Sequence, residues 1–449
     1  MDKPTIILAT SNGIGMGHLA RATAIAEELK AVANPVIVSV AGGVAEISSA
    51  MGIRCEYIPG KTRGWMPRSK WDSYFRDRLL AIAEETHAQM ITFDGVVPYP
   101  GFIATKNSNR NLTTVWVRRG FWQKNLLRFV LPFQSRVVDY IVEPGDFASE
   151  YDHGPTSGRK EARVTAPVSL YKDSDAFSRD DARKVLNLDL TKPAVLVQLG
   201  TGDGDMNQKM TAALSGLVGW KDLQIVLTKD PVDSNGKSLV PAGLEVKVIR
   251  YFPLSRVLQA FDAAIAATGY NSVHELLPAC IPSVFISNIR GTDDQDARAQ
   301  WCHDRGFALR AAHNDLENIT ATVAQLQSKS KRNDLSRRCK DLPAAAGASE
   351  IAQHLLSILN TEKKNSFLQR ALRVTLVRSL HITALAYRTL KPHTIKSGVS
   401  STTPVFGSET DAAELRNLIK GTVPFEHLLA GASGAYVTKR KSIVQKYYP

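Results

Sequence analysis

Residues 5–21 read TIILATSNGIGMGHLAR, and this stretch indicates how the chain folds. The apolar run Thr5–Ala9 is typical of a buried strand, and the spacing of Ala, Ile and Leu over Leu19–Lys30 predicts a helix. A loop with three glycines lies between them, at Gly13, Gly15 and Gly17. Glycine lets a ligand approach the backbone N–H groups at a helix start. An ionisable ring, His18, follows the last glycine, and its presence there needs an explanation.

The same unit restarts further along the chain. Ala194–Leu199 is apolar and is followed by a second glycine loop, 200–204, and by the helical pattern Met206–Leu217. Further strands are predicted at Pro35–Val40, Met90–Phe93, Thr113–Val117, Val137–Val142, Gln224–Thr228, Glu245–Ile249, Ala263–Ala266 and Ser283–Ile286. Strands that alternate with helices predict parallel sheets covered on both faces. We therefore expect an α/β protein with two Rossmann-like, doubly wound domains, 1–165 and 166–360, joined through the polar stretch 152–163.

The composition places the chain among globular proteins with more than one core. It has 449 residues, of which 44% are hydrophobic and 22% charged. No apolar run approaches the roughly 20 residues of a membrane-spanning helix, and the start lacks the pattern of a signal peptide. The four cysteines are scattered, which predicts reduced, buried thiols. The net charge of +13 favours anionic partners.

The C-terminal extension, 361–449, differs from both domains. No acidic residue occurs between Lys363 and Ser408, and leucines recur every four residues from Leu368 to Leu380. Basic residues lie mostly off this apolar stripe of the predicted helix. Three interpretations are open: a helix packed across both domains, an interfacial helix on an anionic membrane, and nucleic-acid binding. Aromatic residues are too few there to favour nucleic acid, which we do not expect as a partner.

The most specific pattern in the chain lies between Arg250 and Leu309. The predicted strand Ala263–Ala266 is followed by a short turn and a helix start, where Asn271 or Ser272 is suited to cap the helix. Glu275 lies three residues after Ser272, which predicts a capping box with Glu275 in the first turn. Such a helix start attracts phosphate, and a carboxylate beside it can bind two ribose hydroxyls. The alternative is that Glu275 only caps its helix.

This stretch resembles the donor-binding signature of the GT-B glycosyltransferases, in particular the MurG-like and UDP-glucuronosyltransferase-like families. The signature combines a strand, a small-residue turn, a Glu, a Gly-x-Pro and a Asp-Gln pair. The matching residues are Gly269, Ser272, Glu275, Ile281-Pro282 and Asp294-Gln295. Cys280 stands where the family usually has Gly, and Asp296 and Arg298 depart from its DQxxNA pattern.

The resemblance implies a role for each part of this signature. Glu275 would hold the ribose, and Asp294 and Gln295 would contact the sugar hydroxyls. The diphosphate would lie against Gly269, Tyr270, Asn271 and Ser272, and the base against Tyr251, Phe252 and Leu254. The loop with Gly200, Thr201 and Gly202 resembles the loop with which MurG-like enzymes approach the diphosphate. Uracil is the usual base in these families, so a UDP-sugar is the favoured donor.

The opening loop NGIGMGHLAR resembles the glycine loop of the same superfamily, in which a His ends the loop and an Arg follows. There the N-terminal domain takes the acceptor, and Gly13, Gly15 and Gly17 would give it access to the backbone. His18 could accept the proton of an acceptor hydroxyl. Asp94 directly follows a predicted strand and is the candidate partner of His18. The alternatives are that His18 caps its helix or binds donor phosphate, and that Asp94 caps a turn.

The last features of the predicted site are two arginines and the possibility of a bound metal ion. Arg118 and Arg119 follow the predicted strand Thr113–Val117, where they suit a phosphate on the acceptor or are simply solvated. No metal site is predicted, because no Asp-x-Asp motif is clearly placed for a divalent ion. The resemblance to GT-B enzymes likewise implies catalysis without a metal ion.

The resemblance implies a cytoplasmic glycosyltransferase of GT-B architecture, with two domains facing a cleft and a basic extension. It would move a sugar from a nucleotide-sugar donor to a hydroxyl acceptor with inversion, and it would need no cofactor besides that co-substrate. The acceptor could be a lipid-linked intermediate, a cell-envelope glycan or a small metabolite, and the inner face of the membrane is a candidate location. A UDP-sugar hydrolase or 2-epimerase on the same fold, and a non-catalytic binding or membrane-recruiting subunit, are the alternatives.

Overall fold

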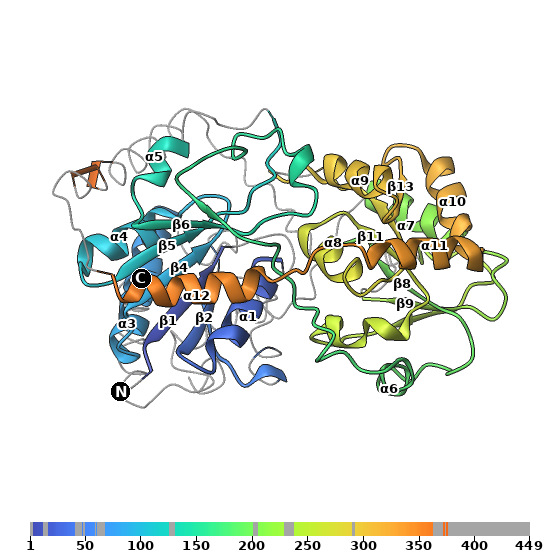
Figure 1. Ribbon diagram of the computed structural model, residues 1–449, viewed down its shortest axis with the longest axis horizontal. Coiled ribbons are helices and arrows are strands. Elements are labelled where there is room, and N and C mark those ends of the chain that lie inside the picture. The colour runs from blue at the N-terminus through green and yellow to red at the C-terminus, as the bar shows by residue number, and fades with distance from the viewer. Residues whose placement is uncertain are drawn as a thin grey trace.

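Two parallel sheets, one in each half of the chain, form the frame of the protein (Figure 1). The computed structural model describes residues 3–11, 17–40, 47, 50–58, 60, 68–124, 131–200, 205–228, 238–289, 292–361, 371–372 and 374–375. Gly13, Gly15, Thr201, Gly202 and nearly all of the extension 361–449 lie outside these residues. What the sequence predicts for them therefore stays a prediction.

The first sheet has seven strands in the order β3-β2-β1-β4-β5-β6-β7, all paired in parallel. The strands are β1 (Thr5–Thr10), β2 (Asn34–Ser39), β3 (Arg54–Tyr57), β4 (Met90–Asp94), β5 (Thr113–Val117), β6 (Tyr140–Glu143) and β7 (Arg163–Val164). The helices of this half are α1 (Gly17–Leu29), α3 (Arg68–Glu85), α4 (Pro100–Ser108) and α5 (Leu131–Ser135). Every residue of β1 is buried, as expected for a central parallel strand covered on both faces.

Side chains of β1 alternate between two apolar layers. Ile7 and Ala9 pack with residues of α3 and α4 on one face of the sheet. Ile6 and Leu8 pack on the other face with residues of α1 and of a helix from the end of the described chain, α12 (Gly347–Leu359). The two-residue period of a strand thus supplies both layers of the core.

The second sheet has six parallel strands in the order β10-β9-β8-β11-β12-β13. They are β8 (Ala194–Gln198), β9 (Gln224–Leu227), β10 (Val246–Val248), β11 (Ala263–Ala267), β12 (Ser283–Ile286) and β13 (Leu309–Ala311). Its helices are α6 (Arg179–Val185), α7 (Asp205–Ser215), α8 (Tyr270–Leu276), α9 (Gln295–Asp304), α10 (Leu316–Ala324) and α11 (Lys329–Cys339), with 3₁₀ turns at Leu254–Ala260 and Gln325–Gln327. Counted from its own first strand, this order repeats that of the first six strands of the other sheet.

The chain crosses between the two halves twice, and the two crossings lie together. Ala166 donates its N–H to Glu350 Oε2 at 3.0 Å, and Gly347 donates its N–H to Pro167 O at 2.9 Å. After the second crossing, α12 lies along the first domain, where Ile351, Leu355 and neighbouring side chains join its core (Figure 1). The division at residues 165 and 166 groups α12 with the second domain, whereas the helix packs on the first. A local pattern shows that α12 is amphipathic but not which sheet it covers.

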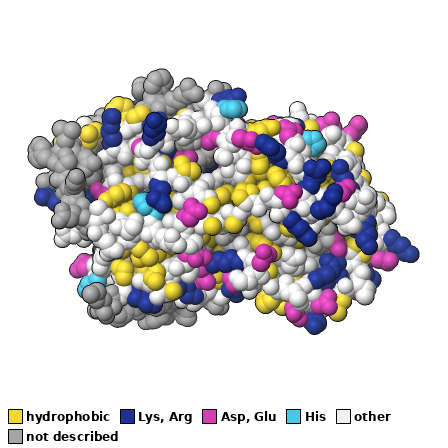
Figure 2. All heavy atoms as spheres, in the orientation of Figure 1, with side chains coloured by type: hydrophobic (Ala, Val, Ile, Leu, Met, Phe, Trp, Pro, Cys, Tyr) yellow, Lys and Arg dark blue, Asp and Glu magenta, His cyan; other side chains and the backbone are white. Residues whose placement is uncertain are grey.

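Most predicted strands occur within one to three residues of their expected positions. The strands that sequence patterns missed are β3, β7 and β13, which are short and contain charged residues. Charged side chains of both signs are mixed on the surface of the second domain. Figure 2 shows Lys and Arg side chains interspersed with Asp and Glu on one face of it. None of the described helices is long and apolar enough to cross a bilayer.

The backbone conformation of Cys280 explains why the family signature has Gly at this position. Its φ is +54°, in the left-handed region, where the chain turns from α8 toward β12. A side chain in this region is strained by about 1–2 kcal/mol, and a β-branched one by more, whereas glycine adopts it freely.

We expect the thermal unfolding midpoint to rank Cys280→Gly above the wild type and Cys280→Val below it. Relief of strain should stabilise the Gly variant by up to about 1 kcal/mol, and Val should lose about 1–2 kcal/mol. Differential scanning calorimetry of the three proteins measures the order. Equal midpoints for Gly and Val would contradict the role of the backbone.

Candidate active site

The candidate site lies where the carboxyl ends of central strands of the two sheets come together. In the first domain, β1 leads toward Gly17 and His18, and β4 ends at Asp94. In the second domain, β11 leads into α8, and Asn271 of this helix donates its Nδ2–H to Gly17 O at 3.3 Å. Ligands of parallel α/β sheets bind outside the carboxyl ends of the strands. The contact between α8 and the start of α1 brings two such edges together.

His18 and Asp94 form the dyad that the sequence predicts. The ring Nδ1 lies 2.6 Å from Asp94 Oδ1, and the two side chains are 13% and 4% exposed. Burial alone would raise the pKa of Asp94, but Arg21 and His18 lower it to about 2. An ionised carboxylate only accepts hydrogen bonds, so the proton of this bond belongs to His18 Nδ1. Nε2 then carries the free lone pair, which is the arrangement of a general base.

Arg21 is the arginine of the loop motif, to which the sequence analysis gave no role. It donates Nε–H to Asp94 Oδ2 at 2.9 Å and Nη2–H to Asp94 Oδ1 at 2.6 Å, and it is buried. Its guanidinium also lies over the ring of Tyr270, 5.1 Å from the centroid. The three-residue step from His18 to Arg21 on one helix face was the available signal. Arg21 thus holds the carboxylate of Asp94 in position.

The charges around His18 favour its neutral form. Burial lowers the pKa of His18, and the cations Arg21 and Arg119 lower it further, together outweighing the attraction of Asp94. The imidazole is therefore ready to accept a proton at neutral pH.

The two adjacent arginines of the first domain have different surroundings. Arg118 is fully buried and paired with Glu143 and Glu161, each at 2.9 Å, and its Nη2 has no hydrogen-bond partner among the described residues. It is therefore not solvated, and its contact with an acceptor phosphate stays a prediction. Arg119 is 14% exposed and makes only long contacts, 3.7 Å to Asp293 Oδ2 and 3.4 Å to Thr292 Oγ1. Its buried Nε has no hydrogen-bond partner among the described residues. Successive side chains leave a strand in opposite directions, so only one of the two faces the second domain.

The start of α8 differs from the predicted capping box. The helix begins at Tyr270 with Gly269 as its N-cap, and no side chain caps it. Ser272 is consequently the third residue of the helix and Glu275 the sixth, beyond the first turn. Gly269 is already extended, at φ −68° and ψ 155°, so the helix starts earlier than the residue types suggest. A Cβ at Gly269 or at Gly17 would meet no atom within 4 Å, so open space adjoins both glycines.

Tyr270 serves the contact between the domains. Its buried hydroxyl donates to Gly145 O at 2.8 Å and accepts from Val168 N–H at 2.9 Å. The side chain is thus committed to the first domain and to a crossing segment, and the predicted phosphate contact could come only from the backbone N–H.

Glu275 is a partly buried carboxyl with no counter-ion. Burial raises its pKa to about 8, and within the described chain no hydrogen bond or ion pair satisfies it. A polar group in this condition is suited to a ligand that supplies donors.

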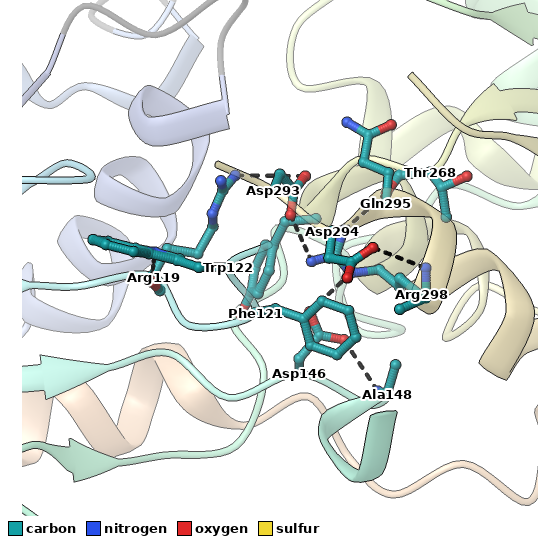
Figure 3. Close-up of polar contacts among 12 residues, drawn as sticks. Arg119, Phe121, Trp122, Asp146, Ala148, Thr268, Asp293, Asp294, Gln295 and Arg298 are labelled. Atoms are coloured by element: carbon teal, nitrogen blue, oxygen red, sulfur yellow. Dashed lines mark hydrogen bonds and ion pairs between the residues drawn. The ribbon is translucent and has the colours of Figure 1, made fainter. Parts of the chain in front are cut away.

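Asp294 and Gln295, the predicted sugar-binding pair, also make hydrogen bonds within the protein. Asp294 Oδ1 accepts from Ala297 N–H at 3.1 Å and caps α9, and Gln295 Oε1 accepts from Asn288 N–H at 2.9 Å. Among the described residues, neither the second carboxylate oxygen of Asp294 nor the Nε2 amide group of Gln295 makes a hydrogen bond, so both are available to a ligand. Both residues are partly exposed, and Figure 3 shows them beside Asp293.

The remaining predicted donor residues lie around this edge of the second sheet. Gly200 follows β8 with φ +86°, a conformation that favours glycine. Tyr251, Phe252 and Leu254 are partly buried, and Phe252 packs against the core of the first domain. In the described chain no group of three or more His, Cys, Asp or Glu is placed to hold a metal ion. A cavity of about 670 Å³ lies near the crossings, lined by residues such as Tyr171, Gln259 and Lys340, and includes none of the predicted site residues.

The pKa of His18 should respond to its two charged neighbours in opposite directions. We expect Asp94→Asn to lower it further, because the attraction of the carboxylate is lost, and Arg119→Gln to raise it, because a repelling cation is removed. NMR titration of ¹³C-labelled histidine measures both shifts. Lys184→Gln, which removes an exposed cation of the second domain, should leave it unchanged. A His18 pKa at or above 6.5 in the wild type would contradict this account.

Comparison with known proteins agrees with this arrangement. Residues 192–355 match the glycosyltransferase family 28 C-terminal domain. The UDP-N-acetylglucosamine--N-acetylmuramyl-(pentapeptide) pyrophosphoryl-undecaprenol N-acetylglucosamine transferase of Rhodococcus jostii (strain RHA1) is 22% identical over 385 residues, 80% of this chain and 97% of that protein. The structure of Acinetobacter baumannii MurG has a TM-score of 0.50 at 15% identity, over 79% of this chain and 99% of that one. A UDP-N-acetylglucosamine 2-epimerase has a TM-score of 0.54 at 13% identity, over 81% and 99%.

The structural matches confirm the predicted fold, two doubly wound domains in GT-B architecture, and they include enzymes with different reactions. The family model and the Rhodococcus jostii relative favour glycosyl transfer among these reactions, because both are glycosyltransferases. Residues 192–355 form a glycosyltransferase family 28 C-terminal domain, and the chain as a whole has the GT-B fold and is similar to N-acetylglucosamine transferases of the MurG kind.

Proposed function

We propose that this protein transfers N-acetylglucosamine from UDP-N-acetylglucosamine to a hydroxyl group, with inversion at the anomeric carbon. The observation that carries the proposal is the His18–Asp94 dyad, 2.6 Å between Nδ1 and Oδ1, in contact with the helix that begins the donor signature. The named activity of the Rhodococcus jostii relative supports the choice of sugar and nucleotide.

In this mechanism His18 acts as the general base. Its Nε2 takes the proton of the acceptor hydroxyl while that oxygen forms a bond to the anomeric carbon. The bond from the anomeric carbon to the donor phosphate breaks on the opposite face, and UDP leaves with the electron pair. Asp94 stabilises the imidazolium that forms, and Arg21 keeps Asp94 ionised and oriented.

The donor is held by the second domain. Glu275, which has no protein partner among the described residues, accepts two hydrogen bonds from the ribose hydroxyls. The diphosphate lies in the open space beside Gly269, against the backbone N–H groups of Asn271 and Ser272. These N–H groups and the Gly200 loop stabilise the charge on the leaving UDP. Tyr251, Phe252 and Leu254 surround the base, and the free groups of Asp294 and Gln295 bind the sugar.

The acceptor side is set by the first domain. Arg119 is a partly exposed cation near His18 with an unpaired Nε, so it is suited to an anionic group of the bound substrates. A lipid-linked diphosphate acceptor meets this condition and corresponds to the substrate named for the Rhodococcus jostii relative. We accordingly place the reaction in the cytoplasm at the inner face of the membrane, with the basic extension 361–449 as the candidate contact with anionic lipid.

The 2-epimerase with the same fold defines the principal competing reaction. Incubation of the protein with UDP-N-acetylglucosamine and no acceptor separates the two activities. A transferase leaves the donor largely intact, whereas an epimerase or hydrolase converts it, and conversion at the rate of the acceptor-dependent reaction would overturn the proposal. Tight UDP binding without any turnover would instead indicate a non-catalytic binding subunit.

Replacement of the base should abolish transfer while preserving the donor site. We expect His18→Ala to lower kcat by about 10²–10⁴-fold, the usual contribution of a general base, with UDP affinity within about 3-fold of wild type. Steady-state kinetics and calorimetric titration with UDP provide the two values. His87→Asn is the matched control, because His87 is exposed at the opposite end of β4 and asparagine tolerates its φ of +50°. Full activity of His18→Ala would rule out this base.

Glu275 should recognise the ribose hydroxyls specifically. We expect the wild type to bind UDP more tightly than 2′,3′-dideoxy-UDP by about 10-fold or more, since the dideoxy nucleotide leaves the carboxyl of Glu275 without partners, which costs about 1–3 kcal/mol. Glu275→Gln should bind the two nucleotides with similar affinity. Glu317→Gln, on the exposed face of α10, should keep the wild-type preference. A preference that survives in Glu275→Gln would exclude this role.

A further inference from the structure

Arg298 lies at the point where the sequence departs from the family pattern, and it is fully buried. All three arms of its guanidinium are used: Nε donates to Asp146 Oδ2 at 2.8 Å, Nη1 to Thr268 O at 2.9 Å and Nη2 to Asp293 Oδ1 at 2.9 Å. The guanidinium also lies over the ring of Phe121, 4.8 Å from its centroid (Figure 3).

These partners come from both domains and from both parts of the donor signature. Asp146 follows β6 and Phe121 follows β5, so both belong to the first domain. Thr268 immediately precedes Gly269 at the start of α8, and Asp293 immediately precedes Asp294. One side chain therefore connects the phosphate-binding turn, the sugar-binding loop and the first domain.

Backbone hydrogen bonds reinforce the same junction. Gln123 donates its N–H to Thr292 O at 2.8 Å, and Asp294 donates its N–H to Phe121 O at 3.0 Å. They form an antiparallel bridge between Trp122 and Asp293. The residue that begins the sugar-binding pair is thus hydrogen-bonded to the domain that carries His18.

The charges make Arg298 necessary for this junction. The side chains of Asp146 and Asp293 are buried, and burial alone would raise their pKa values. Arg298 and His274 hold the pKa of Asp146 below its usual range, and Arg119 and Arg298 do the same for Asp293. Without a cation at this place, two carboxylates would remain in a region with little water. Asp293 would then have only the long contact with Arg119.

We propose that Arg298 is a positioning residue for the donor sugar, which fixes the loop of Asp294 and Gln295 against the first domain. This inference rests on the proposed function of that loop. The sugar is thereby presented to the acceptor at the edge that carries His18. Arg298 touches the phosphate-binding turn only at Thr268 O, and it makes no hydrogen bond to Glu275 or to the residues proposed to surround the base. Loss of the side chain should affect the sugar far more than UDP.

Arg298→Lys tests the proposal, because it keeps the charge but a single ammonium cannot reproduce the planar, three-way set of contacts. We expect kcat/KM for the UDP-sugar to fall by roughly 10²-fold, the effect of a small displacement of a reacting group, with UDP affinity within about 3-fold of wild type. Asp146→Asn, which weakens the anchor in the first domain but keeps the contacts of Arg298 with Thr268 and Asp293, should change both values in the same directions by less.

Arg183→Lys is the matched control. Arg183 is also fully buried and hydrogen-bonds to Ala260 O and Asp262, but all its partners lie inside the second domain. It should lower the unfolding temperature without changing the ratio of sugar-nucleotide to UDP affinity. Equal losses for UDP and UDP-sugar in Arg298→Lys, or wild-type kinetics, would overturn the positioning role.

Hydrogen exchange separates this inference from the proposed function. The amides of Gln123 and Asp294 should exchange at least about 10-fold faster in Arg298→Lys than in wild type, and at unchanged rates in Arg183→Lys, because Arg298 contacts residues of their bridge and Arg183 does not. A wild type that neither binds nor converts any UDP-sugar defeats the proposed function, and the sugar-positioning role with it. Unchanged exchange in Arg298→Lys with an active wild type defeats the positioning role alone.

Discussion

Charges buried between the two domains must be paired, and this requirement links the fold to the site. Arg21 pairs with Asp94 within the first domain, whereas Arg298 of the second domain pairs with Asp146 of the first. An unpaired charge at either place would be strongly destabilising. The relative position of the two sheets therefore depends on side chains that border the candidate site, and the dyad and the donor signature are held in register by the same electrostatic constraint.

Arg119 is not closely paired, and this bears on the chemistry of the site. Its neighbour Arg118, which follows β5, is fully buried and forms ion pairs with two glutamates at 2.9 Å. Arg119 has only contacts of 3.4 and 3.7 Å. Its charge disfavours protonation of His18 and leaves room for an anion beside the base. One strand end thus supplies a structural cation and one that is suited to a substrate.

The return of α12 to the first domain adds a second connection between the halves. Its apolar face completes the layer formed by Ile6, Leu8 and α1, so the first domain is finished only by residues from the far end of the described chain. The basic extension consequently begins at residue 361 beside the acceptor domain rather than the donor domain.

The sequence by itself determined the two α/β units, most strands, and the dyad of His18 and Asp94. These follow from local patterns, because apolar periodicity predicts elements and the carboxyl ends of parallel strands converge on one edge. Only the tertiary structure decided which neighbouring arginine is buried, where α8 begins, and that α12 covers the first sheet. It also showed that the hydroxyl of Tyr270 and the guanidinium of Arg298 join the domains. The burial of Arg118 depends on glutamates 25 and 43 residues away, the contacts of Tyr270 and Arg298 on partners more than 100 residues away, and the start of α8 on backbone dihedral angles. Residue type and spacing carry no information about such partners or angles.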